Sequence, residues 1–280
     1  MLKFCFGLMV LAIVNAGFRA DAQGPVRAPA SNPANRETMA ETVQISLDVD
    51  ADLLIENSEG QRVGLDFTSR KFVDEIPGAR VVANEGSATF VLPFDKSGQP
   101  YKISVAGKSA SRVDADLRMT GAGFVVGFRG VRLTAGQRQT MTMAANGLHL
   151  SFTAGQDGLT PQLFMTTQSG RDKPSYRFEV GSPELKTGKT ITVDLDREKG
   201  RLYFKADDAR KVSFTATMRR TNPSGTRDLF AHKDISFGKV NSYAMDFGQW
   251  DGRGELCFYE ICNNCKENVC TKLRSDPSGR

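Results

Sequence analysis

The sequence has few of the residues, and none of the short motifs, by which most enzyme sites are recognised. Its 280 residues include two histidines and one tryptophan, and it lacks H-E-x-x-H, G-x-S-x-G and a phosphate-binding glycine loop. His149 lies in an alternating apolar–polar segment and His232 where a loop leads into another, and no motif places a nucleophile beside either. We therefore expect a protein that is not an enzyme. The alternative is a secreted hydrolase with an unrecognised site, in which a histidine would meet an aspartate and a serine in a cleft.

Helical periodicity is also lacking, because no segment carries apolar side chains at 3.6-residue spacing over three turns. Apolar residues instead alternate with polar ones, which places successive side chains on opposite faces of a strand. The apolar members of the first such run are Val43, Ile45, Leu47, Val49, Ala51, Leu53 and Ile55. Turn residues recur about every 8–12 residues, and Asn146-Gly147 between two runs favours a hairpin with a type I′ turn. These patterns predict an all-β protein of the sandwich kind.

Long hydrophobic runs are absent except at residues 4–18, and these 15 residues are too short for a comfortable membrane span. Lys3 precedes this run and Ala20-Asp21-Ala22 follows it, as in a secretory signal with an A-x-A cleavage site. Residues 1–22 are therefore predicted to be a signal peptide, the alternative being an uncleaved anchor helix. We expect a secreted, periplasmic or extracellular protein with no membrane span after signal removal. The formal net charge of +5 is a mild excess, which gives no reason to expect nucleic-acid binding.

The remaining chain divides by composition into a leader, two domains and a tail. Residues 23–42 are rich in Pro, Ala, Asn and Ser and predict a flexible leader. Two β-sandwich domains of the immunoglobulin-like or jelly-roll-like kind are expected at 43–107 and 110–250, on either side of a short hinge at 107–111. Residues 251–280 are expected to form a cysteine-rich hairpin and tail. The word V-D-A-D-L occurs at Val49–Leu53 and again at Val113–Leu117, which is compatible with a duplication.

The first domain resembles β-sandwich modules appended to bacterial secreted and surface proteins, including the post-peptidase carboxy-terminal domain. The words that carry the resemblance are D-A-D-L-L-I-E-N-S-E-G at Asp50–Gly60, F-V-L-P at Phe90–Pro93 and G-Q-P-Y-K-I-S-V-A-G at Gly98–Gly107. The family pattern is D-A-D-L-x-V-x-D-x-x-G, then V-P, then G-x-Y-x-V-x-V-x-G. The resemblance implies an accessory, non-catalytic domain that binds surfaces, polymers or partner proteins. We therefore expect an exported, non-catalytic binding protein whose partner is a cell-surface polymer or protein.

Four of the five cysteines lie in the tail, at Cys257, Cys262, Cys265 and Cys270. Their spacing is palindromic, so a hairpin would pair Cys257 with Cys270 and Cys262 with Cys265 as two nested disulfides, which suits an exported chain. A four-thiolate zinc site is the rival, but Cys257 and Cys262 would lie about 16 Å apart along an extended strand, whereas zinc requires every sulfur within ~2.3 Å. A redox Cys-x-x-Cys is the third possibility, and it usually needs a helix N-terminus that nothing here predicts.

An acidic run raises the possibility of calcium binding through Asp48, Asp50 and Asp52. Alternate carboxylates are suitable ligands for calcium, which takes six to eight oxygens. The EF-hand pattern needs glycine at its sixth position, however, and Leu53 stands there. The competing interpretation is a solvated strand face whose like charges oppose edge-to-edge aggregation.

Two further features are candidates for ligand contact. Arg219, Arg220 and Arg227 flank the turn Asn222–Gly225 and form a basic tip that could touch an anionic polymer such as a cell-wall glycan, although such tips are often only soluble hairpin ends. Trp250 could stack on a sugar ring or, alternatively, fill the core of the second domain.

Overall fold

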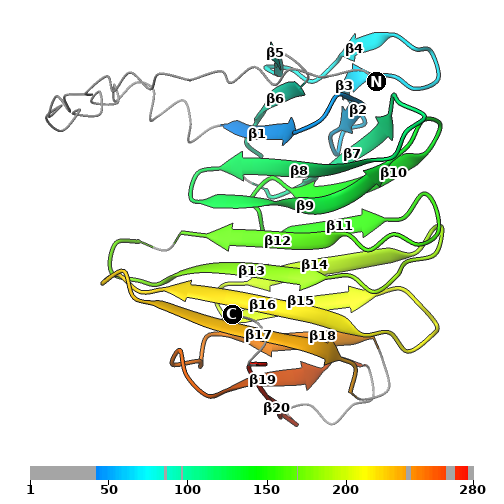
Figure 1. Cartoon of the computed structure of the whole chain (residues 1–280). Coiled ribbons are helices and arrows are strands. Elements are labelled where there is room, and N and C mark those ends of the chain that lie inside the picture. Colours follow the sequence, from blue (N-terminus) through cyan, green and yellow to red (C-terminus); the bar gives the residue numbers. More distant parts are fainter. Residues whose placement is uncertain are drawn as a thin grey trace, which may run out of the picture.

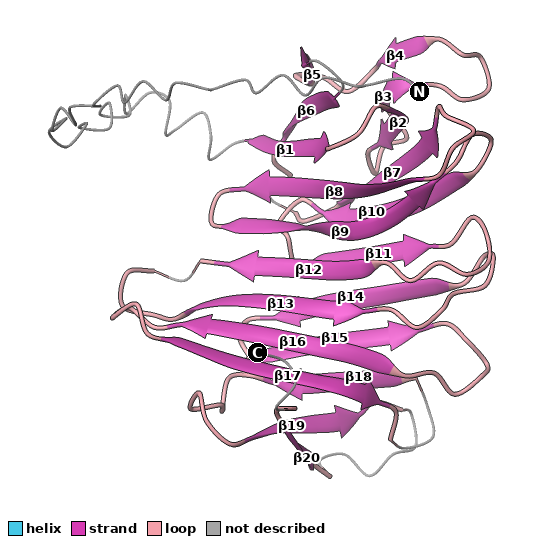
Figure 2. Cartoon of the chain, viewed as in Figure 1, coloured by secondary structure: helices cyan, strands magenta, loops and turns pink. Residues whose placement is uncertain are grey.

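The computed structural model describes residues 42–84, 87–95, 97–168, 170–237, 241–262 and 269–276, and all regular structure in them is β-strand (Figure 1, Figure 2). The predicted signal peptide and nearly all of the predicted leader lie outside these residues. The strands are β1 (Thr42–Leu47), β2 (Ala51–Glu56), β3 (Arg62–Leu65), β4 (Phe72–Asp74), β5 (Arg80–Asn84), β6 (Ser87–Pro93), β7 (Pro100–Gly107), β8 (Val113–Gly121), β9 (Phe124–Leu133), β10 (Arg138–Ala144), β11 (His149–Thr153), β12 (Gln162–Thr167), β13 (Ser175–Gly181), β14 (Thr190–Asp196), β15 (Arg201–Ala206), β16 (Phe214–Thr221), β17 (Arg227–Ile235), β18 (Ser242–Asp246), β19 (Glu255–Glu260) and β20 (Thr271–Arg274). The prediction of an all-β sandwich with a C-terminal disulfide is confirmed.

The strands form two antiparallel sheets that face each other along the whole described chain. The nine-stranded sheet has the order β17-β16-β13-β12-β9-β8-β1-β6-β5, and the eleven-stranded sheet has the order β20-β19-β18-β15-β14-β11-β10-β7-β2-β3-β4. In Figure 1 the strands succeed one another down the molecule, from β4 and β5 at one end to β19 and β20 at the other. The molecule is therefore one elongated sandwich, and its two ends carry the edge strands of both sheets.

The expected boundary at 107–110 does not separate two sandwiches. β1 and β8 lie on opposite sides of it and pair in the nine-stranded sheet, with Leu47 opposite Leu117. β7 and β10 likewise pair in the eleven-stranded sheet, with Ile103 opposite Met141. Alternation of polar and apolar residues indicates strands but not their partners, so it does not distinguish the turn at 107–111 from a hinge between domains.

From β8 onward the chain adds hairpins alternately to the two sheets, and this produces an internal repeat. The sets β8–β11, β12–β15 and β16–β19 each place two strands in the nine-stranded sheet and then two in the eleven-stranded sheet. The sets begin at Val113, Gln162 and Phe214, so the repeat is about 50 residues long. Before the fourth strand of each set lies a glycine with positive φ, at 70° in Gly147, 63° in Gly200 and 71° in Gly254.

The predicted hairpin at Asn146-Gly147 is present, because β10 pairs with β11. Its turn is not of type I′, however. That turn requires positive φ at both central residues, and here Gly147 has positive φ while Asn146 does not. The Asn146 side chain instead accepts a hydrogen bond from the Leu148 backbone N–H at 3.0 Å, a local bond that asparagine often supplies in turns.

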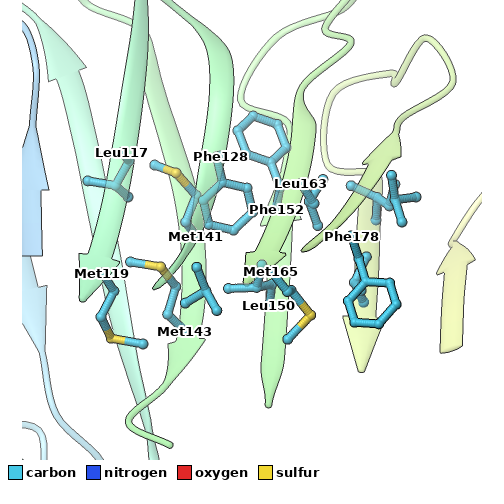
Figure 3. Close-up of a cluster of buried hydrophobic side chains, with 14 of the residues drawn as sticks. Leu117, Met119, Phe128, Met141, Met143, Leu150, Phe152, Leu163, Met165 and Phe178 are labelled. Carbon is cyan, nitrogen blue, oxygen red and sulfur yellow. The ribbon is translucent and has the colours of Figure 1, made fainter. Parts of the chain in front are cut away.

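A continuous apolar core fills the space between the sheets (Figure 3). Leu117 from the nine-stranded sheet and Met141 from the eleven-stranded sheet are fully buried, as are the neighbouring rings Phe128 and Phe152, whose centroids lie 6.0 Å apart. Burial of one such side chain contributes roughly 1.5–3 kcal/mol. The same cluster includes Ile45, Leu92 and Ile103 from before residues 107–110, so the core is shared across the expected boundary.

The C-terminal residues cover one edge of the nine-stranded sheet. β17 is an edge strand, and its Ala231 carbonyl accepts a hydrogen bond from the Asp276 backbone N–H at 2.7 Å. The Lys233 backbone N–H donates in turn to the Asp276 carboxylate at 2.8 Å, and the Ala231 N–H donates to Ser275 Oγ at 3.1 Å. A covered edge offers fewer free backbone groups for pairing with another chain.

In the described part of the chain, no helix is long and apolar enough to cross a membrane.

Candidate functional site

The three aspartates predicted to bind calcium do not converge. The chain bends at residues 48–50, which separates β1 in one sheet from β2 in the other and interrupts what the alternation predicted to be one strand. Asp48 accepts a hydrogen bond from the Asp116 backbone N–H at 2.7 Å, and Asp50 forms an ion pair with Lys108 at 2.5 Å. Asp52 pairs with Arg70 at 3.2 Å. Among the described residues no group of three His, Cys, Asp or Glu side chains is placed to hold a metal ion, so this calcium site is not formed.

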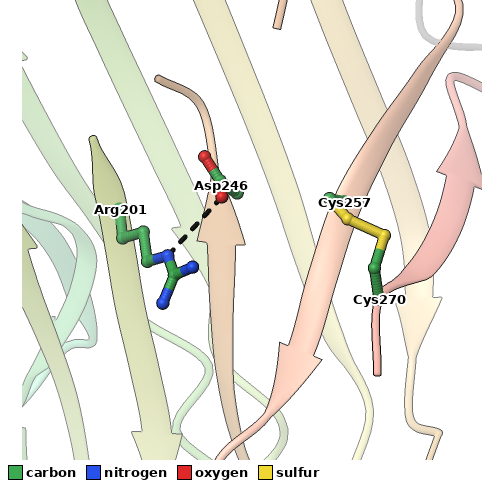
Figure 4. The surroundings of a disulfide bond; sticks show 4 residues. All are labelled: Arg201, Asp246, Cys257 and Cys270. Atoms are coloured by element: carbon green, nitrogen blue, oxygen red, sulfur yellow. Dashed lines mark ion pairs between the residues drawn. A yellow bond between two sulfur atoms is a disulfide. The ribbon is translucent and has the colours of Figure 1, made fainter. Parts of the chain in front are cut away.

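The cysteines form the predicted outer disulfide, Cys257–Cys270, with the two Cα atoms 5.4 Å apart (Figure 4). The hairpin register differs from the prediction by two residues. Cys257 lies opposite Lys272, and Cys270 precedes β20 as a diagonal neighbour. Cys262 is also disulfide-bonded, and its predicted partner Cys265 lies outside the described residues. A disulfide removes two of the four thiolates that the alternative zinc site requires.

Trp250 is a core residue and not an exposed platform for a sugar. Its side chain is 6% exposed and meets the Phe230 ring edge-to-face at 6.3 Å. A sugar ring stacks on a free aromatic face, and this indole offers none. This burial favours the competing interpretation of Trp250 as a core anchor over a contact with ligand.

Among the described residues, each histidine has an acidic neighbour but no serine partner. His149 Nδ1 lies 2.6 Å from Asp194 on the outer face of the eleven-stranded sheet. His232 Nδ1 lies 2.9 Å from the Arg274 carbonyl oxygen and 3.4 Å from Asp276. In the described part of the chain neither imidazole is hydrogen-bonded to a serine hydroxyl, which is the contact that activates the nucleophile.

The predicted basic tip is divided between the two faces of the nine-stranded sheet. Arg219 and Arg220 are neighbours on β16, so their side chains point in opposite directions. Arg220 lies on the inner side, 3.7 Å from Asp228, and faces Tyr176 across the strand pair. Arg219 lies on the outer face, and so does Arg227 from β17. The tip therefore presents two guanidinium groups, those of Arg219 and Arg227, on the outer face. The third, that of Arg220, lies on the inner side near Asp228.

Neighbouring strands complete a site around the two outward arginines. Arg177 of β13 is directly opposite Arg219, and Ser175 is opposite Thr221, which is itself opposite Arg227. Directly opposed residues have Cβ atoms about 4.5–5.5 Å apart, so these side chains lie within reach of one ligand group. Together they line a cavity of 240 Å³. We call this site the arginine corner, and its lining residues are Thr166, Ser175, Tyr176, Arg177, Arg219, Thr221 and Arg227.

The arginine corner carries an excess of positive charge. Glu179 lies 2.7 Å from Arg177 but also 3.0 Å from Arg129, so one carboxylate serves two guanidinium groups. Neither Arg219 nor Arg227 has an acidic partner at ion-pair distance within the described residues. Like charges directly opposite each other in a sheet are destabilising, and a bound anion would relieve the repulsion between Arg177 and Arg219. Guanidinium groups bind carboxylate, sulfate and phosphate with paired N–H donors, and the three hydroxyls can donate further hydrogen bonds.

Sequence reasoning identified Arg219 and Arg227 but missed Arg177, Thr166 and Ser175, which lie on two other strands. Alternation indicates that Ser175 and Arg177 share a face, but it does not indicate that β13 pairs with β16.

The comparisons with known proteins give no relative from which a function could be transferred: no protein family, curated protein or solved structure matches the chain.

Proposed function

We propose that the chain is an exported, non-catalytic protein that binds an anionic polymer of the cell surface or extracellular space through the arginine corner. The observation that carries this proposal is the pair Arg219 and Arg227, two outward guanidinium groups without acidic partners in the described residues, beside a third guanidinium and three hydroxyls.

Several other features support the proposal. The Cys257–Cys270 disulfide is typical of proteins in oxidising compartments, as are secreted and periplasmic ones. The predicted signal peptide and the resemblance of residues 50–107 to accessory β-sandwich modules are in accord with it. The site lies on the open outer face of a sheet, where an extended polymer can pass without entering a deep cleft.

The test is the binding of the signal-free chain to immobilised polymers at low ionic strength. Polygalacturonate and heparin supply carboxylate and sulfate groups, dextran is the neutral control, and polyglutamate represents an acidic protein partner. We expect binding to the two anionic polysaccharides that weakens with added salt, because screening acts on exposed charges. Binding to polyglutamate alone would favour a protein partner and overturn the proposal.

The variant that tests the site combines Arg219→Gln with Arg227→Gln. Each exposed charge contact is worth about 0.4–1 kcal/mol, so the affinity should fall roughly 3- to 30-fold. The matched control combines Arg80→Gln and Lys205→Gln, which make the same change in net charge. Arg80 is exposed on β5, at the opposite edge of the same sheet, and Lys205 is exposed on the other sheet. An equal loss in both variants would show that net charge, not the arginine corner, binds the polymer.

A further inference from the structure

A second and larger cavity opens beside the arginine corner and has no role in the proposal above. Its volume is 560 Å³, within the range of small-molecule sites. Three segments that are distant in sequence form it: the residues after β12, the turn between β14 and β15, and the residues after β18. We call it the end cavity.

The wall of the end cavity is apolar and rigid. Tyr176 and Phe247 line it with their ring centroids 4.9 Å apart, and Phe247 also packs on Phe178 at 4.8 Å. Gly200 and Gly248 bring two backbones into contact there, since a Cβ atom on Gly200 would lie 2.5 Å from the Gly248 Cα. Tyr176 is only partly buried and can receive the apolar face of a sugar ring, whereas the buried Phe247 holds the Tyr176 ring in place.

The rim of the end cavity is cationic. Lys173, Arg197 and Lys199 line it, with Glu198 as the acidic residue among the lining side chains. Lys199 is ion-paired with Asp196 at 3.3 Å, whereas Lys173 and Arg197 have no ion-pair partner among the described residues.

The end cavity and the arginine corner adjoin. They meet at the ends of β12 and β13, where Tyr176 lines both. They approach these strand ends from opposite faces of the nine-stranded sheet, because Thr166 lies opposite Arg177 on the outer face and Thr167 lies opposite Tyr176 on the inner face. Successive units of one polymer that passes around these strand ends would occupy both sites. Gln168 and Gln249 add amide groups for sugar hydroxyls.

We infer that the end cavity binds a sugar ring bearing a carboxylate or sulfate, while the arginine corner binds the anionic group of a neighbouring unit of the same chain. This inference rests on the proposed function. It specifies the ligand as an anionic polysaccharide that binds at two subsites, the end cavity and the arginine corner.

The experiment measures the affinity of the signal-free chain for oligogalacturonates of one to six units, for heparin-derived oligosaccharides and for neutral cello-oligosaccharides of the same lengths. We expect affinity to rise at least tenfold between the monomer and the tetramer of one anionic series, and neutral oligomers not to bind. The series that binds more tightly distinguishes carboxylate from sulfate.

The variant for the end cavity combines Lys173→Gln and Arg197→Gln, with the Arg80→Gln, Lys205→Gln protein as its charge-matched control. We expect a 3- to 30-fold loss of hexamer affinity, a loss below threefold in the control, and unchanged thermal unfolding, since both side chains are exposed. If the hexamer binds and only the Arg219→Gln, Arg227→Gln protein is weakened, the second subsite is refuted while the proposed function stands. If no anionic polymer or oligomer binds at all, the proposed function itself has failed.

Discussion

Replacement of Leu117 by alanine tests whether the sandwich is one cooperative unit. Leu117 is fully buried on β8, just after the boundary that composition suggested. It lies opposite Leu47 of β1 on one side and Phe128 of β9 on the other. A cavity at this position removes contacts from strands on both sides of residues 107–110. We expect the free energy of unfolding to fall by about 2.5–5 kcal/mol, as for other buried leucines.

The assay is differential scanning calorimetry of the signal-free chain. In a domain of about 150–250 residues, each kcal/mol shifts the midpoint by roughly 2–4 °C, so the Leu117→Ala protein should unfold some 5–20 °C lower. Leu229→Ala is the matched control, because Leu229 is 37% exposed on β17 and should cost far less. We expect one transition that moves as a whole. Two transitions, only one of which moves in Leu117→Ala, would refute the shared core.

Three further predictions concern particular contacts. Loss of the terminal disulfide in Cys257→Ser, Cys270→Ser should lower the unfolding free energy in urea by about 2–4 kcal/mol, and no change would mean that this cross-link does not stabilise the fold. Gly127→Ala should be strongly destabilising, because its Cβ would lie within van der Waals overlap of the Leu117 carbonyl oxygen, whereas Gly170→Ala faces open space and should be neutral within about 0.5 kcal/mol. Burial raises the pKa of Tyr101 to about 12, so the folded state disfavours the phenolate, and the stabilisation present below pH 10 should be lost as the pH rises toward 12. Tyr101→Phe should remove that pH dependence in urea titrations and cost about 1 kcal/mol at pH 7, since the hydroxyl donates to a backbone carbonyl.

The strands could be predicted from the sequence because a period of two appears directly in the order of residues. Which sheet each strand joins could not be predicted. The bend at residues 48–50 leaves the alternation from Val43 to Ile55 uninterrupted, although β1 and β2 belong to different sheets. The two V-D-A-D-L words proved not to be equivalent, since one crosses that bend and the other lies within β8.

The repeat of about 50 residues was missed for a related reason. It is expressed as a recurring order of hairpins and a glycine with positive φ, at Gly147, Gly200 and Gly254, and not as a shared word. Neighbouring sets join edge to edge in both sheets, since β9 pairs with β12 and β11 pairs with β14. The three sets of strands thus share their backbone arrangement, which different sequences can form, and do not share a sequence motif.

The sequence predicted two residues of the arginine corner, Arg219 and Arg227, but not the residues that other strands add to it. Arg219 and Arg220 were grouped because they are adjacent in sequence, but adjacency on a strand sends side chains to opposite faces. Arg177 was missed because it is placed by the pairing of β13 with β16, a contact between segments about 40 residues apart. The sequence allows Trp250 either to stack on a sugar or to fill the core, and only the position of the ring against Phe230 shows its packing role.

The most direct test of binding at the arginine corner is an NMR titration that follows arginine side-chain Nε–Hε signals while oligogalacturonate or heparin oligosaccharide is added. Those of Arg177, Arg219 and Arg227 should shift together and saturate with one dissociation constant, while that of Arg80, on the same sheet at its far edge, should stay in place. Equal shifts for Arg80 and the three corner arginines, or shifts centred on the eleven-stranded sheet, would contradict the assignment of polymer binding to this site.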